Sequence, residues 1–138
     1  MNPEKITVEA TIKGDLKKIW RYWTQPNHIT EWNFASDDWC CPKAENDLRV
    51  GGKMSSRMEA KDGSFGFDFE GVYDEIFDQE KITYTMPDGR VSTTTFESLG
   101  KHVEVTTIFD AEAQNSLAMQ REGWQAILNN FKSYVESH

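Results

Sequence analysis

The stretch that decides the fold closes the chain: residues 117–135 read LAMQREGWQAILNNFKSYV. Apolar side chains recur in it at helical spacing, with polar residues opposite, which predicts a helix over about residues 113–135. At about 1.5 Å per residue this helix is roughly 34 Å long, enough to cross a whole small sheet. We expect it to bury one stripe against a sheet and to leave Glu122, Gln125 and Asn129 exposed. The predicted stripe consists of Leu117, Gln120, Trp124, Ile127, Leu128, Phe131 and Val135.

The residues before this helix read as a series of strands separated by turns. Asp62-Gly63 and Pro87-Asp88-Gly89 are turn signals of the hairpin type. Gly71 interrupts one run of alternating residues, which predicts a bulge or a sharp bend there. The predicted strands cover residues 54–60, 65–77, 82–86, 91–97 and 102–110, with a short strand at 48–50, and apolar and polar residues alternate in residues 65–77.

The first part of the chain is predicted to contain one strand and two short helices. KITVEATIK, residues 5–13, alternates like a strand, and Asp15 is a plausible N-cap of a first helix that contains Trp20 and Trp23. Pro26 ends this helix and can open the next, which extends to about Trp32, so the two helices should form a V. Residues 33–47 have no clear period and are expected to form a loop, with at most a turn of helix or a short strand.

This order of elements defines the fold class. A strand, two short helices, a run of strands and a long helix are typical of an α+β protein with an antiparallel sheet. The chain has 138 residues, the usual size of one domain, and no repeat or linker divides it. We therefore expect a single domain over residues 1–138, in which the sheet curves around the C-terminal helix.

Composition excludes several classes of partner. The net charge of −8, without a stripe of Lys and Arg, disfavours nucleic acid and anionic membrane surfaces. The chain has no apolar run long enough to span a membrane, and its start lacks the apolar core of a secretory leader. We expect a monomer in the cytoplasm.

The two cysteines and the absence of cofactor motifs indicate whether a disulfide, a metal or a cofactor is expected. Cys40 and Cys41 are adjacent, so a bridge between them would be strained, and no spacing typical of a metal site accompanies them. We expect two reduced thiols and no metal. The sequence also lacks a P-loop, a dinucleotide-binding glycine fingerprint, a nucleophile elbow and an HExxH motif, so no cofactor is predicted.

The aromatic residues are the strongest hint of a ligand site. Five tryptophans in so short a chain need a thick core or a cavity, and several of these rings must simply pack the core. The rest are expected to line a pocket that opens at the V of the short helices. Trp23, Trp32, Phe34 and Trp39 would lie near the entrance, and Phe69, Tyr84 and Trp124 deeper. The full set of candidate ligand-binding residues is Trp23, Trp32, Phe34, Trp39, Phe67, Phe69, Tyr84, Met86, Met119 and Trp124.

The sequence signals for catalytic residues are weaker than those for ligand binding, and no catalytic residue is predicted. Glu70 or Glu75 could act as a general base if the strand turned one of them inward, but exposed acids on strands are far commoner. His28 and Glu31 could exchange protons at the pocket mouth, but an exposed helical histidine explains the pattern better. Asp47, Arg49 and the following glycines fit an ion pair beside a turn better than a charged pair in a cavity wall.

Taken in order, several segments resemble the AHSA family, named for a domain of the activator of the heat-shock chaperone ATPase. This family belongs to the START-like (SRPBCC) superfamily, with the polyketide cyclases and the birch-pollen allergens. The resemblance covers nearly the whole chain. It rests on Trp20, Thr24, Trp32, residues 47–52 (DLRVGG), residues 69–76 (FEGVYDEI), residues 80–82 (EKI) and Gly123-Trp124.

The resemblance implies a helix-grip fold, in which a ligand cavity lies between a curved sheet and the long helix. It does not select one function, because this scaffold serves carriers, receptors, enzymes and co-chaperones. We expect binding of a lipid, polyketide or flavonoid-like molecule without chemistry. The alternatives are a cyclase or hydrolase-like enzyme that uses an inward carboxylate or histidine, and a co-chaperone-like interaction module. The chaperone activator carries a further N-terminal domain, for which this chain has no room.

Overall fold

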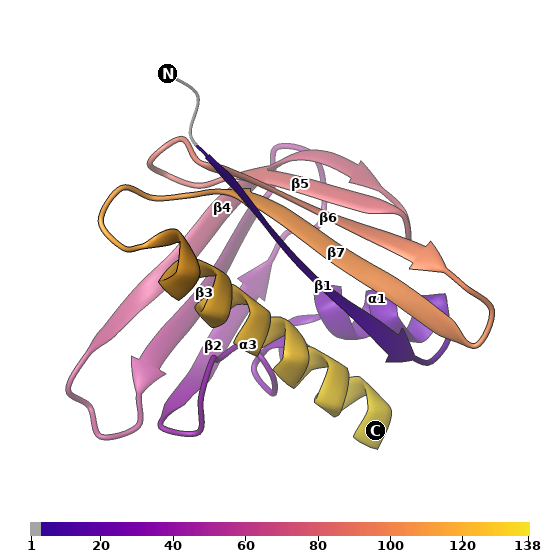
Figure 1. The fold of residues 1–138 in the computed structure, drawn as a ribbon, viewed down its shortest axis with the longest axis horizontal. Helices are drawn as coiled ribbons and strands as arrows, with labels where there is room; N and C mark the ends of the chain where they lie inside the picture. Colours follow the sequence, from indigo (N-terminus) through magenta and orange to yellow (C-terminus); the bar gives the residue numbers. More distant parts are fainter. Residues whose placement is uncertain (1–3) are drawn as a thin grey trace.

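The computed structural model describes residues 4–138, which form a seven-stranded sheet and three helices (Figure 1). The helices are α1 (Leu16–Thr24), α2 (Pro26–Ile29) and α3 (Leu117–Ser137). The strands are β1 (Lys5–Lys13), β2 (Trp39–Asn46), β3 (Lys53–Ala60), β4 (Gly66–Phe77), β5 (Lys81–Thr85), β6 (Val91–Ser98) and β7 (His102–Asp110). The predicted order of elements is confirmed, apart from β2 and the short strand at 48–50.

All neighbouring strands run antiparallel, in the order β1-β7-β6-β5-β4-β3-β2. The first strand thus pairs with the last one, with Ile6 opposite Phe109 and Ile12 opposite Val103. The sheet curves around α3, which crosses its concave face, while α1 lies near the C-terminal end of α3 (Figure 1). This arrangement is the α+β architecture expected from the sequence.

The two short helices form as predicted, with one difference in length. Asp15 caps α1, because its carboxylate accepts a hydrogen bond of 2.8 Å from the backbone N–H of Lys18. Pro26 takes the first position of α2, where its missing N–H costs nothing. The helix ends at Ile29, and the chain continues to Trp32 as a turn rather than as the predicted helix.

Two predictions for the segment before β3 are wrong. Residues 39–46 form the edge strand β2 and not a loop. Its alternation is hidden because Pro42 sits where the pairing with β3 shifts register, between Cys40 and Lys43, and such a bulge tolerates a residue without an N–H. Residues 48–50, predicted as a strand, form a turn instead.

Gly71 also differs from the prediction. Its pairing with Met54 on β3 is regular, and the register of β4 shifts against β5 only between Tyr73 and Glu75. The bulge therefore lies a few residues further along the strand than the glycine suggests.

The long helix buries its C-terminal half more completely than its start. Leu128, Phe131 and Val135 are almost fully buried, in one core with β1 and β7. Leu117 is 41% exposed, so its predicted burial is wrong. Helical spacing places Leu117 on the buried stripe, but α3 packs mainly on β1, and its first turn lies away from that contact.

Side chains of α3 also bind the outer edge of β1. Gln125 accepts from the backbone N–H of Glu9 at 3.3 Å and donates to its carbonyl at 2.9 Å. Glu136 accepts from the backbone N–H of Lys13 at 2.9 Å. Gln125 is thus half-buried against a strand rather than fully exposed as predicted, because it satisfies backbone groups that have no neighbouring strand.

Candidate functional site

A cavity of about 380 Å³ lies between the concave face of the sheet and α3. Its wall follows the two-residue period of the strands, since alternate residues of a strand point to the same face. Met54, Ser56 and Met58 come from β3, for example, and Ile82 and Tyr84 from β5. Helix α3 supplies the opposite wall through Met119, Gln120, Gly123, Trp124, Ile127 and Leu128.

Aromatic rings form the middle of this wall. Trp124 of α3 stacks on Phe109 of β7, with ring centroids 3.8 Å apart and planes 10° apart. Phe69 of β4 meets Trp124 edge-on at 6.0 Å and Tyr84 of β5 edge-on at 6.2 Å. Three of these rings, Phe69, Tyr84 and Trp124, face the cavity. The cavity is therefore bordered by flat apolar surfaces on both the sheet and the helix.

The two tryptophans at the V of the short helices close one end of the cavity. Trp23 and Trp32 stack with centroids 5.0 Å apart, and both meet Phe131 edge-on. The indole N–H of Trp32 donates to the carbonyl of Tyr22 at 3.0 Å, so the ring is fixed. Trp32 is only 4% exposed, and its predicted place at an open entrance is therefore wrong.

Away from these two tryptophans, some residues of the cavity wall are exposed to solvent. Phe67 on β4 and Met119 in the first turn of α3 are 41% and 60% exposed, and Asn115, just before α3, is exposed too. Glu45 of β2 is the other exposed lining residue within the described part of the chain. The cavity thus meets solvent where the strands β2 to β4 face the start of the long helix.

Seven of the ten candidate residues lie on the cavity wall, and three do not. The seven are Trp23, Trp32, Phe67, Phe69, Tyr84, Met119 and Trp124. Phe34 lies in a separate shallow pocket beside Ala126 and Asn130 of α3, because the loop after α2 crosses to that side of the helix. Trp39 packs against Phe65 and Phe67 at the edge of the sheet. Met86 is buried in the turn after β5 and does not reach the cavity.

A polar network on the wall escaped the sequence reasoning. The hydroxyl of Tyr73 donates to Oδ1 of Asn46 at 2.5 Å, and Nδ2 of Asn46 donates to the carbonyl of Thr24 at 2.6 Å. Burial raises the pKa of Tyr73, so this phenol stays protonated near neutral pH. The network joins β4 and β2 to the end of α1 and fixes that part of the wall.

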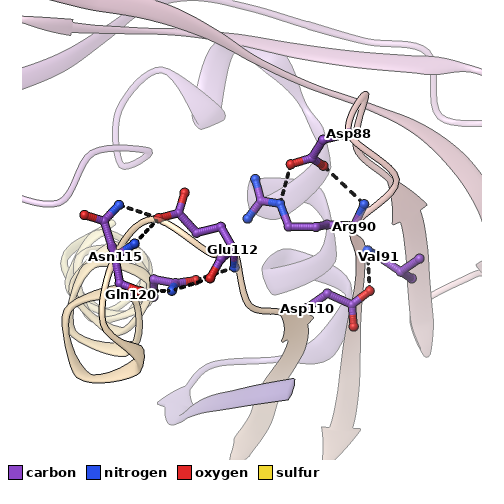
Figure 2. Close-up of polar contacts among 7 residues, drawn as sticks. All are labelled: Asp88, Arg90, Val91, Asp110, Glu112, Asn115 and Gln120. Atoms are coloured by element: carbon purple, nitrogen blue, oxygen red, sulfur yellow. Dashed lines mark hydrogen bonds and ion pairs between the residues drawn. The ribbon is translucent and has the colours of Figure 1, made fainter. Parts of the chain in front are cut away.

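A second polar group gathers where β6, β7 and the start of α3 meet (Figure 2). Nε of Arg90 donates to Asp88 at 2.7 Å, while Asp110 accepts from the backbone N–H of Val91 at 2.9 Å. Figure 2 shows the guanidinium of Arg90 directed toward the loop that carries Glu112, while the carboxylate of Glu112 turns toward Asn115; both residues line the cavity. This end of the cavity is therefore charged, unlike its aromatic middle.

Gln120 holds the loop that carries Glu112. Its Oε1 accepts from the backbone N–H of Glu112 at 2.8 Å, and its Nε2 donates to the carbonyl of Asn115 at 2.8 Å. Glu112 in turn accepts from the backbone and side-chain nitrogens of Asn115. Gln120 was predicted as part of an apolar stripe, but its burial serves these hydrogen bonds instead.

The acids and the histidine weighed as catalysts lie outside the cavity. Glu70 pairs with Lys53 at 2.9 Å and Glu75 with Lys81 at 3.3 Å. Neither acid is on the cavity wall, and no inward general base is found at these positions. His28 bonds through Nδ1 to the hydroxyl of Tyr134 at 2.7 Å and stacks on Tyr22.

The turn at residues 47–52 is structural, as the sequence favoured. Arg49 and Asp47 form an exposed ion pair at 2.8 Å, and Gly51 has a φ of +84°, a backbone conformation that suits glycine. A Cβ atom on Gly52 would lie 2.1 Å from the carbonyl oxygen of Asp47. The glycines therefore serve the turn and do not shape a charged site.

Together, the curved sheet, the helix across it and the enclosed cavity define a helix-grip α+β protein. Residues 14–136 match the family described as Activator of Hsp90 ATPase homolog 1-like protein. The chain belongs to this family, which confirms the resemblance read from the sequence.

Solved structures of similar proteins share the fold. The AHSA1-like protein from Aeromonas hydrophila is 41% identical, with a TM-score of 0.91 over 97% of this chain and 93% of that one. Chr148 from Cytophaga hutchinsonii is 47% identical, with a TM-score of 0.83 over 96% and 92%. CV1439 from Chromobacterium violaceum is 22% identical, with a TM-score of 0.87 over 97% and 99%, a likeness of fold alone. No curated protein matches the chain. Among residues 4–138, no helix combines the length and apolarity needed to cross a membrane.

Proposed function

We propose that the protein binds an apolar or aromatic small molecule, of lipid, polyketide or flavonoid type, in the cavity between the sheet and α3. The cavity itself carries this proposal. Packed protein interiors rarely leave voids larger than a water molecule, whereas this one measures about 380 Å³. That volume falls within the range of roughly 300–1,000 Å³ typical of small-molecule pockets.

The wall sets the expected chemistry and strength of binding. Phe69, Tyr84 and Trp124 offer ring faces and edges to a ligand, and Met58 and Met119 offer adaptable thioethers. Burying about 200 Å² of apolar ligand surface yields roughly 5 kcal/mol before the cost of association. Affinity in the micromolar range or weaker is therefore the expectation.

The proposal is tested by ligand-observed NMR against a panel of fatty acids, flavonoids and aromatic polyketides, followed by titration of tryptophan fluorescence. A ligand in the cavity removes water from the ring of Trp124 and should quench its emission or shift it to shorter wavelength. Substitution of Gly123 by leucine provides the blocking variant. A Cβ atom at Gly123 meets nothing within 4 Å, and the residue lines the cavity, so the larger side chain should fill the site and leave the fold intact.

Ala118→Leu is the matched control, because Ala118 lies in the same helix, is exposed and is not on the cavity wall. Hits should bind the wild type and Ala118→Leu alike and should fail to bind Gly123→Leu. If no panel member binds, or if the blocking variant binds equally well, the cavity is not a ligand site.

A second candidate function is an interaction with a chaperone, which the family name suggests. One feature supports it: Trp39, Phe65 and Phe67 form an aromatic cluster at the edge of the sheet, where Phe65 is 62% exposed. Binding of purified Hsp90 to the wild type and to Phe65→Ser, measured by biolayer interferometry, tests this candidate. Equal binding, or none to either protein, would count against this surface as the partner site.

A further inference from the structure

A buried hydroxyl lies next to the charged end of the cavity. Ser92 is 1% exposed, and its Oγ has no hydrogen-bond partner among residues 4–138. Thr94, two residues further along β6, has its side chain on the same concave face and lines the cavity, while Ser92 lies just behind the wall with its hydroxyl closed to solvent. This hydroxyl acts on the neighbouring phenol of Tyr84 and not on a ligand directly.

Tyr84 adds a second hydroxyl at the same place. It pairs with Ser92 across β5 and β6 and lines the cavity. Burial raises the pKa of Tyr84 to about 12, while the neighbouring Ser92 hydroxyl and the charge of Arg90 act in the opposite direction. The phenol is therefore protonated at neutral pH and can donate a hydrogen bond. The Ser92 hydroxyl is the polar side-chain neighbour of this phenol.

Arg90 supplies the charge. Its Nε is bound to Asp88, and this contact and the turn at residues 87–90 hold the side chain in place (Figure 2). The two terminal nitrogens, Nη1 and Nη2, form no hydrogen bond or ion pair with residues 4–138. These nitrogens form a planar fork whose geometry matches a carboxylate.

We propose that this end of the cavity binds the carboxylate of an amphipathic ligand through Arg90 and Tyr84, while the ligand's apolar body lies between Phe69 and Trp124. The inference rests on the proposed function and names the class of ligand: a monocarboxylic acid with a long aliphatic or aromatic tail. The two donors come from β5 and from the turn that leads into β6, and the aromatic surfaces continue from them along the wall.

Glu112 limits the affinity for such an anion. It lines the same end of the cavity as Arg90, with its carboxylate turned toward Asn115 (Figure 2), and its negative charge opposes a carboxylate bound nearby. The two hydrogen bonds that it accepts from Asn115 reduce but do not remove this effect. Glu112→Gln keeps an oxygen acceptor for Asn115 and removes the charge, so it should strengthen binding of a carboxylate and weaken binding of a cation.

The test compares three probes with the same ten-carbon chain: decanoate, decanol and decylamine. Each is titrated into the wild type, Arg90→Gln, Tyr84→Phe and Glu112→Gln by isothermal titration calorimetry, with thermal unfolding of each variant as a check on folding. Decanoate should bind the wild type more tightly than decanol, and decylamine most weakly. Arg90→Gln should weaken decanoate about ten- to hundredfold and leave decanol unchanged.

Tyr84→Phe separates a ligand contact from a packing role. It keeps the ring that packs on Gly71 and removes the hydroxyl, so it should weaken decanoate about three- to tenfold and unfold at a temperature close to that of the wild type. Glu112→Gln should bind decanoate more tightly than the wild type.

The outcomes separate the two proposals. Equal binding of decanol and decanoate, or an Arg90→Gln variant that binds decanoate normally, would overturn the carboxylate inference and leave the apolar cavity as the ligand site. Tightest binding of decylamine would overturn it as well and would assign this end to a cation beside Glu112. Failure of all three probes to bind would contradict the proposed function and the inference with it.

Discussion

The ring of Tyr84 occupies the space beside Gly71 that a side chain would need: a Cβ atom on Gly71 would lie 2.6 Å from Cδ2 of the ring. Gly71 is therefore a packing requirement of the cavity wall and not the site of a bulge. The backbone of β4 comes close enough to support the phenol, which in turn borders the cavity next to Ser92.

Substitution of Gly71 by alanine should destabilise the protein by about 1–3 kcal/mol, because the added methyl group must displace the Tyr84 ring or the strand. Urea denaturation measures the loss, and near-ultraviolet circular dichroism reports the displaced tyrosine. The double variant Gly71→Ala/Tyr84→Leu should recover part of the stability, since the ring that clashes is gone. A single variant as stable as the wild type would show that the ring moves without cost.

Substitution of Gly123 by alanine should raise the stability of the protein, whereas the same change at Gly71 should lower it. It lies inside α3, and a Cβ atom there meets nothing within 4 Å. Gly123→Ala should therefore stabilise the protein by about 0.5–1 kcal/mol, because alanine restricts the unfolded chain and suits a helix. Urea denaturation under the same conditions is the measurement. A loss of stability would mean that the space beside Gly123 is needed for the packing of α3.

The two leucines of the predicted stripe should differ sharply in how much stability is lost when each is replaced by alanine. Leu128 is 2% exposed and packs in the core, so Leu128→Ala should cost about 2–5 kcal/mol. Leu117 is 41% exposed, and its replacement by alanine should change the free energy of unfolding by less than about 0.5 kcal/mol. Chemical denaturation of both variants checks this contrast. Similar losses for the two would place the first turn of α3 in the core after all.

His28 should make stability depend on pH. Burial lowers the pKa of His28, Arg21 and His138 act in the same direction, and Glu31 opposes them. Because the folded state favours the neutral ring, its contribution is complete above the unfolded pKa of about 6.5 and is lost as the pH falls through the lower folded pKa.

The thermal midpoint of the wild type should therefore drop between roughly pH 7 and pH 5 more steeply than that of His28→Gln. Exposed His102→Gln is the control for the altered number of histidines. If His28→Gln has the same pH profile as the wild type, the ring does not control this transition.

The sequence predicted the elements whose signals are local. Asp15 marks the start of α1 through a capping bond three residues away, and Pro26 marks the start of α2 through its own ring. Six of the seven strands were predicted from alternation or turn residues. The edge strand β2 was missed because Pro42 and its bulge break the pattern, and only pairing with β3 makes this segment a strand.

The aromatic part of the cavity wall was more accessible to sequence reasoning than the polar part. Phe69 and Trp124 stand out by size and spacing. Arg90 and Glu112 lie in a turn and in a loop, where no periodicity shows which way a side chain points. Their directions depend on contacts made only in the folded protein, such as the amide of Gln120 on the backbone of Glu112. Turn residues next to a predicted strand are the signal that could have drawn attention to Arg90.

The hydrogen bonds from α3 to β1 have a consequence for the protein in concentrated solution. An edge strand with free backbone groups is a template on which another chain can add its own strand and begin to aggregate. Gln125 and Glu136 occupy such groups at Glu9 and Lys13 along β1. At the other end of the sheet, Pro42 lacks an N–H, and the bulge beside it disrupts the edge of β2. Both borders of this open, curved sheet thus oppose the addition of a foreign strand.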